Sequence, residues 1–142
     1  MNVSLCLTIA GSDSGGEAGI QADLKTFSDF GCHGLSAITA NTAQSPNKII
    51  SLNPVNQTCL NDQLKALFGC FDIKFIKTGL LPNIEIMESI LKLIPTDATL
   101  ICDPLIASTS GTEIMSLNSI KFFKNEFSKR IDYLTPNLPE AE

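Results

Sequence analysis

Hydrophobic residues along this chain fall into two alternating kinds of segment. Short apolar runs bounded by glycine, proline or polar residues are typical of buried parallel strands. They predict strands over residues 4–10, 34–43, 49–55, 73–78, 98–102 and 131–135. Between most of these runs, apolar residues recur every three or four positions, which indicates amphipathic helices. We expect these helices around residues 20–27, 60–71, 87–94 and 120–127.

Residues that begin and end helices support this division. Gly31 stands where a helix C′ glycine would, Asn83 is a plausible N-cap, and Pro95 stops the helix that follows Asn83. The Ser45-Pro-Asn47 turn separates the second and third strands. Strands that alternate with helices predict an α/β fold with a mainly parallel sheet, and we expect residues 1–142 to belong to one domain.

Composition excludes several classes of function. The formal net charge is −5 and 44% of the residues are hydrophobic, so a nucleic-acid or anionic-membrane surface is not expected, and Lys74 and Lys77 are predicted to lie on solvated faces. The chain shows no secretory signal and no membrane-spanning run, which predicts a cytoplasmic protein. We expect reduced, mostly buried thiols, because the five cysteines are odd in number and form no C-x-x-C; they are Cys6, Cys32, Cys59, Cys70 and Cys102.

A glycine-dense junction follows the first predicted strand and leads into the first predicted helix. Glycines at 11, 15, 16 and 19 let backbone approach a ligand closely, at the sheet edge where α/β proteins bind ligands. The junction is neither a Walker loop, since Glu17 and Ala18 follow Gly16, nor a G-x-G-x-x-G fingerprint. Glu17, expected in the first helical turn, would repel an anion, so we expect this loop to face a neutral ligand.

Three polar residues, one on a predicted helix and two at predicted strand ends, are candidates for ligand contact. Asp23 lies one helical turn after Gly19, although a solvated position is the ordinary interpretation of a helix aspartate. Gln44 follows a buried strand, and its amide can match the acceptor and donor of a 4-aminopyrimidine edge. Asp103 precedes Pro104 at a strand end, where a plain turn is the alternative. His33, the only histidine, is expected to be structural, because no serine or carboxylate partner is evident.

Several of these strings together resemble one family. Gly11-Ser-Asp-Ser-Gly-Gly16, Gln21-Ala-Asp-Leu-Lys-Thr26, Lys77-Thr-Gly-Leu-Leu81, Asp103-Pro-Leu-Ile-Ala-Ser-Thr-Ser-Gly111 and the pair Asn137 and Glu140 resemble motifs of the hydroxymethylpyrimidine and phosphomethylpyrimidine kinases of thiamin biosynthesis. This family belongs to the ribokinase-like superfamily. The likeness implies a three-layer α/β/α fold, of which this chain resembles the N-terminal half, so the domain is expected to be truncated at its C-terminus.

The resemblance also implies roles for particular residues. Gln44 and Asp23 would contact the pyrimidine, and Gly11, Ala18, Thr42 and Leu80 would line its pocket. Leu80 stands where relatives usually carry methionine, and Glu17 replaces a glycine, which we expect to weaken binding of a phosphorylated substrate. Asp103 and Asn137 would lie on the ATP phosphate side. Asn137 and Glu140 would support a hydrated magnesium ion through water molecules.

The implied activity is phosphoryl transfer from ATP to 4-amino-5-hydroxymethyl-2-methylpyrimidine and then to its monophosphate, with Mg²⁺ as cofactor. The resemblance also implies a homodimer, and a catalytic base that comes from a later G-T-G-x-G-D motif. This sequence does not contain that motif. We therefore expect no catalytic base in this chain, and no activity from the chain alone. Two alternatives stay open. They are a pyridoxal or pyridoxine kinase and a non-catalytic remnant of the fold that binds a pyrimidine.

Overall fold

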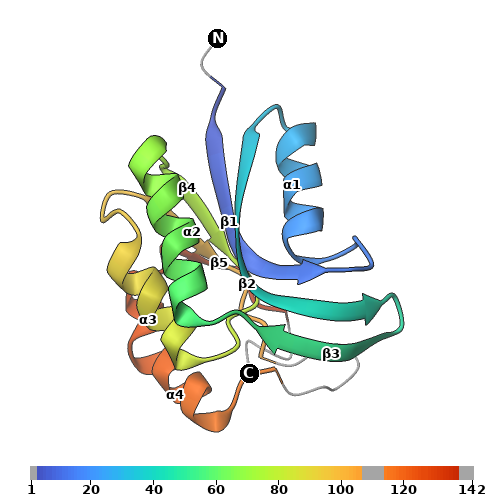
Figure 1. The fold of residues 1–142 in the computed structure, drawn as a ribbon. Helices are drawn as coiled ribbons and strands as arrows, with labels where there is room; N and C mark the ends of the chain where they lie inside the picture. The colour runs from blue at the N-terminus through green and yellow to red at the C-terminus, as the bar shows by residue number, and fades with distance from the viewer. Residues whose placement is uncertain (1–2, 107–113, 138–142) are drawn as a thin grey trace.

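The computed structural model describes residues 3–106 and 114–137, which alternate between strands and helices (Figure 1). The strands are β1 (Leu5–Asp13), β2 (His33–Ser45), β3 (Lys48–Pro54), β4 (Phe75–Thr78), β5 (Thr99–Cys102) and β6 (Tyr133–Leu134). The helices are α1 (Gly19–Asp29), α2 (Gln57–Cys70), α3 (Ile84–Leu93), α4 (Leu117–Asn125) and the 3₁₀ helix η1 (Phe127–Arg130). The predicted α/β order is therefore confirmed.

The strands form one sheet in the order β3-β2-β1-β4-β5-β6. Within the described ranges, every pairing is parallel except that between β2 and β3, so the sheet is mainly parallel, as predicted. The connection between β2 and β3 contains only Pro46 and Asn47, and so short a link can join only antiparallel strands. These two strands form a hairpin, which the prediction of a generally parallel sheet did not anticipate.

Helices cover both faces of the sheet and give three layers. On one face, Leu7, Ile76 and Leu100 of the central strands pack with α2, α3, α4 and η1 in a buried apolar core. On the other face, α1 packs against β1 and β2, and its Leu24 and Phe27 lie over Gly34. A Cβ at position 34 would stand 2.7 Å from the Leu24 side chain, so this glycine allows α1 to approach the sheet closely.

Asparagine and serine side chains begin three of the helices. Asn83 accepts a hydrogen bond from the Ile86 amide at 3.0 Å, which confirms the predicted cap of α3. Asn56 and Ser116 cap α2 and α4 in the same way, through the amides of Cys59 and Ser119. These caps satisfy backbone donors that the first helical turn leaves unpaired.

Several boundaries and exposures differ from expectation. The first strand was expected to end at Ala10, but it continues to Asp13, because the β1 backbone stays paired with Asn41 and Thr42 of β2. The expectation of mostly buried cysteines is wrong, since Cys102 is the buried one. Of the string from Asn137 to Glu140, only Asn137 lies within the described residues. Over residues 3–106 and 114–137, no helix has the length and apolar character needed to cross a membrane.

Candidate functional site

A cavity of about 360 Å³ lies beyond the carboxyl ends of β1, β4 and β5 and beside the β2–β3 hairpin. This is the sheet edge at which open α/β proteins bind ligands. All six residues predicted to form the pyrimidine pocket line it, namely Gly11, Ala18, Asp23, Thr42, Gln44 and Leu80. Much of the remaining wall is apolar, with Ala10, Ala22, Ile49, Leu52, Leu105 and Ile114. The cavity therefore suits a small, mainly apolar ring with a few polar substituents.

Asp13, at the end of β1, organises the glycine junction. Its side chain is almost fully buried, and its carboxylate accepts hydrogen bonds from three backbone amides. The Oδ1 atom accepts from Gly15 at 2.7 Å, and Oδ2 accepts from Glu17 at 3.0 Å and from Ala18 at 2.9 Å. Because these three amides already donate to the Asp13 carboxylate, they are not available to bind a phosphate. This geometry supports the expectation that the loop faces a neutral ligand.

Two further contacts join the start of α1 to β1. Gln21 accepts a hydrogen bond from the Asp13 amide at 2.8 Å and donates to the Ser12 hydroxyl at 2.8 Å. Gly19 has a φ of +58°, and a Cβ there would lie 2.2 Å from the Gly11 carbonyl oxygen. Glu17 lies before the helix and is exposed, so placing it in the first turn was wrong. The start of α1 is thus held tightly against the strand.

Gln44 reaches the cavity from the end of β2. Its backbone exchanges two hydrogen bonds with the Ser14 hydroxyl, at 2.9 and 3.0 Å, which joins the hairpin to the glycine junction. The Thr42 hydroxyl lies 3.1 Å from both the Gln44 Oε1 and the Ser12 carbonyl oxygen, although it has one proton to donate. If a ligand amine donates to Oε1, the Thr42 hydroxyl can still donate its hydrogen bond to the Ser12 carbonyl oxygen. The Thr42 hydroxyl and the Gln44 Oε1 atom would then both have a hydrogen-bond partner when the ligand is bound.

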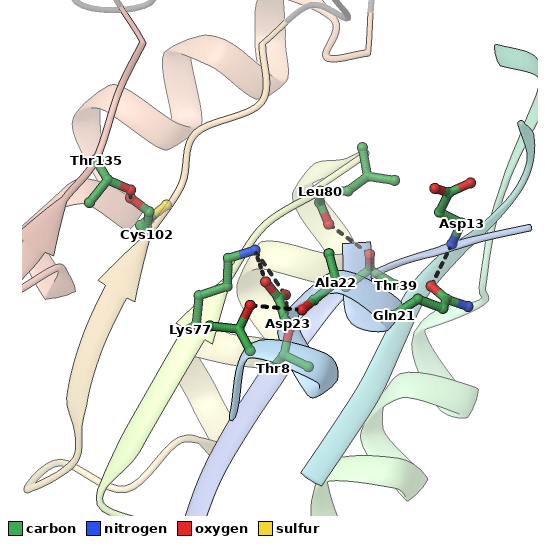
Figure 2. A network of polar contacts seen from close by, with 11 residues as sticks. Thr8, Asp13, Gln21, Ala22, Asp23, Thr39, Lys77, Leu80, Cys102 and Thr135 are labelled. Carbon is green, nitrogen blue, oxygen red and sulfur yellow. Dashed lines mark hydrogen bonds and ion pairs between the residues drawn. The ribbon is translucent and has the colours of Figure 1, made fainter. Parts of the chain in front are cut away.

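Asp23, on α1, faces the sheet rather than solvent, so the solvated alternative is wrong. Figure 2 shows its carboxylate between Lys77 of β4 and Thr8 of β1. The Lys77 Nζ lies 3.0 Å from Oδ1 and 2.9 Å from Oδ2, and the Thr8 hydroxyl donates to Oδ2 at 2.6 Å. The Lys77 side chain is 21% exposed and lines the cavity, so the predicted solvated position is wrong for this residue.

Leu80 closes the cavity on the β4 side. It is 6% exposed, and the buried Thr39 hydroxyl fixes its carbonyl oxygen at 2.6 Å (Figure 2). A Cβ on Gly11 would stand 2.6 Å from the Leu80 Cδ2 atom. Any larger residue at position 11 would therefore require the Leu80 side chain to move. The Leu80 side chain therefore packs directly against the β1 backbone at Gly11.

The residues predicted for the phosphate and metal side are only partly gathered. Asp103 lines the cavity at the end of β5, whereas Asn137 is exposed after β6 and does not line it. Glu140 lies outside the described residues. No cluster of three histidine, cysteine, aspartate or glutamate side chains occurs in the part of the chain that the structure describes. The oxygen donors of Asp103 and Asn137 suit Mg²⁺, which needs few direct carboxylates because it retains water.

Perturbed ionisable groups lie outside this cavity. Burial, with the neighbouring Cys32 thiol, raises the pKa of Cys6 to about 11. A hydrogen bond from the Leu100 amide, helped by Arg130, lowers the pKa of Asp132, and Lys74 lowers the pKa of Asp97. The shifts at Asp132 and Asp97 belong to ion pairs at the sheet margin, so they affect stability rather than ligand binding.

Sequence reasoning did not identify Asp13 or Lys77 as part of the site. Asp13 was visible only as part of the Gly11-Ser-Asp-Ser-Gly-Gly16 string, although an Asx residue before two glycines often accepts local amide hydrogen bonds. Lys77 lies between Ile76 and Thr78, whose side chains are both buried, near the end of β4. A charged residue inside such a short buried strand is the signal that could have identified it.

Comparisons with known proteins agree with the fold and the strings described above. The chain is 40% identical over 140 residues to the hydroxymethylpyrimidine/phosphomethylpyrimidine kinase of Aquifex aeolicus, covering 97% of this chain and 55% of that protein. The crystal structure of phosphomethylpyrimidine kinase from Clostridium difficile superposes with a TM-score of 0.86 and 37% identity, covering 98% of this chain and 61% of that one. Pyridoxal kinase of Staphylococcus aureus, solved with AMP-PCP and pyridoxal, gives a TM-score of 0.81 at 27% identity, covering 99% and 51% of the two chains.

The extent of these matches is as informative as their identity. The chain spans about half the length of the curated relatives it matches, and the matches include nearly all of this chain's residues. A model of the family described as phosphomethylpyrimidine kinase matches residues 13–142. On this match and the sequence identities, the chain belongs to the phosphomethylpyrimidine kinase family.

Proposed function

We propose that this chain supplies the pyrimidine-binding part of a kinase that phosphorylates 4-amino-5-hydroxymethyl-2-methylpyrimidine, and then its monophosphate, using ATP. The observation that carries the proposal is the cavity, where Gln44 and Asp23 meet mainly apolar walls of a size that suits one substituted ring. Membership of the phosphomethylpyrimidine kinase family supports the same substrate class.

Gln44 would recognise the aminated edge of the ring. Its Oε1 would accept from the exocyclic amine, and its Nε2 would donate to the neighbouring ring nitrogen. Within the described residues, Nε2 makes no hydrogen bond, so it is available for this contact. Leu80 and Leu52 would exclude water from the ring faces. The amides of the Asp13 loop already donate to the Asp13 carboxylate, which suits an uncharged alcohol better than an anion.

The phosphate donor would approach from the β5 side. Asp103 at the cavity and Asn137 after β6 have the oxygen donors that a hydrated magnesium ion prefers, and ATP with this ion would supply the transferred phosphoryl group. Transfer of this kind depends on alignment and charge neutralisation. The G-T-G-x-G-D string expected to contribute the base does not occur in residues 1–142, so we expect this polypeptide alone to bind the alcohol without phosphorylating it.

Calorimetric titration of the purified chain with the pyrimidine alcohol tests the proposal. We expect binding, and a loss of roughly tenfold or more in affinity for Gln44→Ala, because a buried ligand amine and ring nitrogen would lose their partners. Gln57→Ala is the matched control, since Gln57 is an exposed glutamine on α2. Absence of binding, or an unchanged affinity in Gln44→Ala, would refute the assignment.

Pyridoxal is the second candidate substrate, because the Staphylococcus aureus pyridoxal kinase shares the fold over this whole chain. Pyridoxal has no amine at the ring edge that Gln44 would recognise, so we expect it to bind more weakly than the pyrimidine. Competition between the two ligands, measured by the same titration, separates the alternatives. The homodimer expected from the family resemblance stays a prediction, which light scattering of the purified protein would test.

A further inference from the structure

Lys77 and Asp23 form an ion pair inside the cavity wall. Thr8, Lys77, Ile101 and Tyr133 are register partners across β1, β4, β5 and β6, so their side chains share the face of the sheet on which α1 lies. Asp23 approaches this row from α1 (Figure 2). The Lys77 and Asp23 side chains are 21% and 18% exposed, and both line the cavity.

The hydrogen bonds of the Asp23 carboxylate determine what it can still accept. A carboxylate has about four acceptor positions, two on each oxygen. Thr8 and Lys77 occupy both positions on Oδ2, and the second contact of Lys77 occupies one on Oδ1. Among the described residues, no other donor reaches Oδ1. One acceptor position therefore remains, on an oxygen whose direction is set from two sides.

We propose that Lys77 is a positioning residue that holds Asp23 so that its single remaining Oδ1 acceptor receives an N–H donor of the ligand. This inference rests on the proposed function, because the donor would be the amino group of an aminated heterocyclic alcohol, through the N–H bond that Gln44 does not accept. A carboxylate on a helix could otherwise rotate about two side-chain bonds. Lys77 removes that freedom before the ligand arrives, which increases affinity and favours ligands that carry the donor.

The neighbouring backbone leaves room for this arrangement. A Cβ on Gly79 would stand 3.1 Å from the Lys77 Nζ and 3.1 Å from the Ala10 Cβ. Glycine at position 79 therefore lets the lysine lie across the end of β4 toward α1. Lys74, in contrast, lies at the opposite end of the strand region, 46% exposed, with its Nζ on Asp72 and Asp97.

The test measures the ratio of affinities for 4-amino-5-hydroxymethyl-2-methylpyrimidine and for the same ring with hydrogen in place of the amine. Calorimetry of wild type, Lys77→Met, Asp23→Asn and the double variant gives this ratio, with Lys74→Met as the matched control. We expect wild type to favour the amine at least about tenfold, and Lys77→Met to lose the part of that preference that Asp23 contributes while keeping the part that Gln44 contributes. Lys74→Met should keep it.

The double variant decides whether Lys77 acts through Asp23. If it does, adding Lys77→Met to Asp23→Asn leaves the ratio unchanged, since the group being positioned is already absent. An unaltered ratio in Lys77→Met, or a further fall in the double variant, would overturn the proposal. The double variant also leaves no unpaired charge in the wall, so we expect it to fold even if a single variant does not, and its ratio against wild type then measures what the ion pair contributes as a unit.

A measurement without ligand separates this inference from the proposed function. If wild type binds neither ring, the proposed substrate class fails, and the crystal structure of ligand-free Lys77→Met decides the positioning role. We expect the Asp23 carboxylate to rotate away from its wild-type direction or to occupy more than one. A carboxylate that keeps one unchanged direction, held by Thr8 alone, would show that Lys77 does not position it.

Discussion

Gly19 is the position where a single methyl group should most disturb the junction between β1 and α1. Its φ of +58° lies in the left-handed region, and a Cβ would stand 2.2 Å from the Gly11 carbonyl oxygen. Gly31, at the other end of α1, has a φ of +72° with no atom within 4 Å of its Cβ position. The two alanine variants therefore share the backbone penalty and differ in the steric contact.

The magnitudes follow from this difference. The left-handed conformation costs a non-glycine residue about 1–2 kcal/mol, which is the whole effect expected for Gly31→Ala. Gly19→Ala adds the cost of overpacking, about 1–3 kcal/mol, because the start of α1 must move away from a carbonyl oxygen of the sheet. We expect Gly19→Ala to be the less stable variant by about that additional amount. It should also bind the pyrimidine more weakly, because Gly19 lines the cavity.

Urea unfolding followed by circular dichroism measures both free energies of unfolding, and titration of the folded variants measures affinity. Gly31→Ala controls for the conformational term and should bind the ligand as wild type does, since it lies outside the cavity lining. Equal stability losses in the two variants would mean that the close approach of α1 to the Gly11 carbonyl oxygen does not contribute. Normal ligand affinity in a destabilised Gly19→Ala would separate the junction from the site.

Three further predictions concern charge and reactivity. Asp13→Asn should lower the free energy of unfolding by about 2–3 kcal/mol and speed hydrogen exchange at the Glu17 and Ala18 amides, because an asparagine NH₂ would face backbone donors; unchanged exchange would contradict this. The pKa of Asp132 is lowered below 3.8 by the Leu100 amide and Arg130, so its ionised form stabilises the fold above pH 3.8. That stabilisation should disappear as pH falls through the lowered pKa, and acid titration of unfolding should be shallower in Asp132→Asn; parallel curves would refute it. The Cys6 thiol, with its pKa raised to about 11 by burial and by Cys32, should react with a thiol reagent at pH 8 more slowly than the exposed Cys70; equal rates by peptide mass mapping would contradict it.

Some features of the site could be predicted because they depend on local pattern and on one rule of topology. Alternating strands and helices indicate a parallel sheet, and the carboxyl ends of parallel strands meet at one edge. This placed Gly11 and Gln44 at one sheet edge before any coordinates, and the family resemblance added Asp23; the structure puts all three on the cavity. Their roles toward a ligand stay predictions, as do those of Asn137 and Glu140.

Other features could not be predicted, because they depend on strand neighbours and on register. Lys77 meets Asp23 across 54 residues of sequence, and this pair exists only because β4 lies beside β1 with Thr8 opposite Lys77. No periodicity specifies which strand will be the neighbour. A charged residue near a strand end is therefore interpreted as solvated until the sheet order is known.

The sequence by itself determined the succession of elements, the exclusion of a phosphate-cradling motif at the first loop, and the family through its strings. Only the tertiary structure decided that β3 turns back beside β2 and that Lys77 forms an ion pair with Asp23. The physical reason is the distance along the chain over which each kind of interaction acts. Backbone and hydrophobic preferences act over a few neighbouring residues, whereas hydrogen bonds and ion pairs in this site join side chains that only the packed sheet brings within 3 Å.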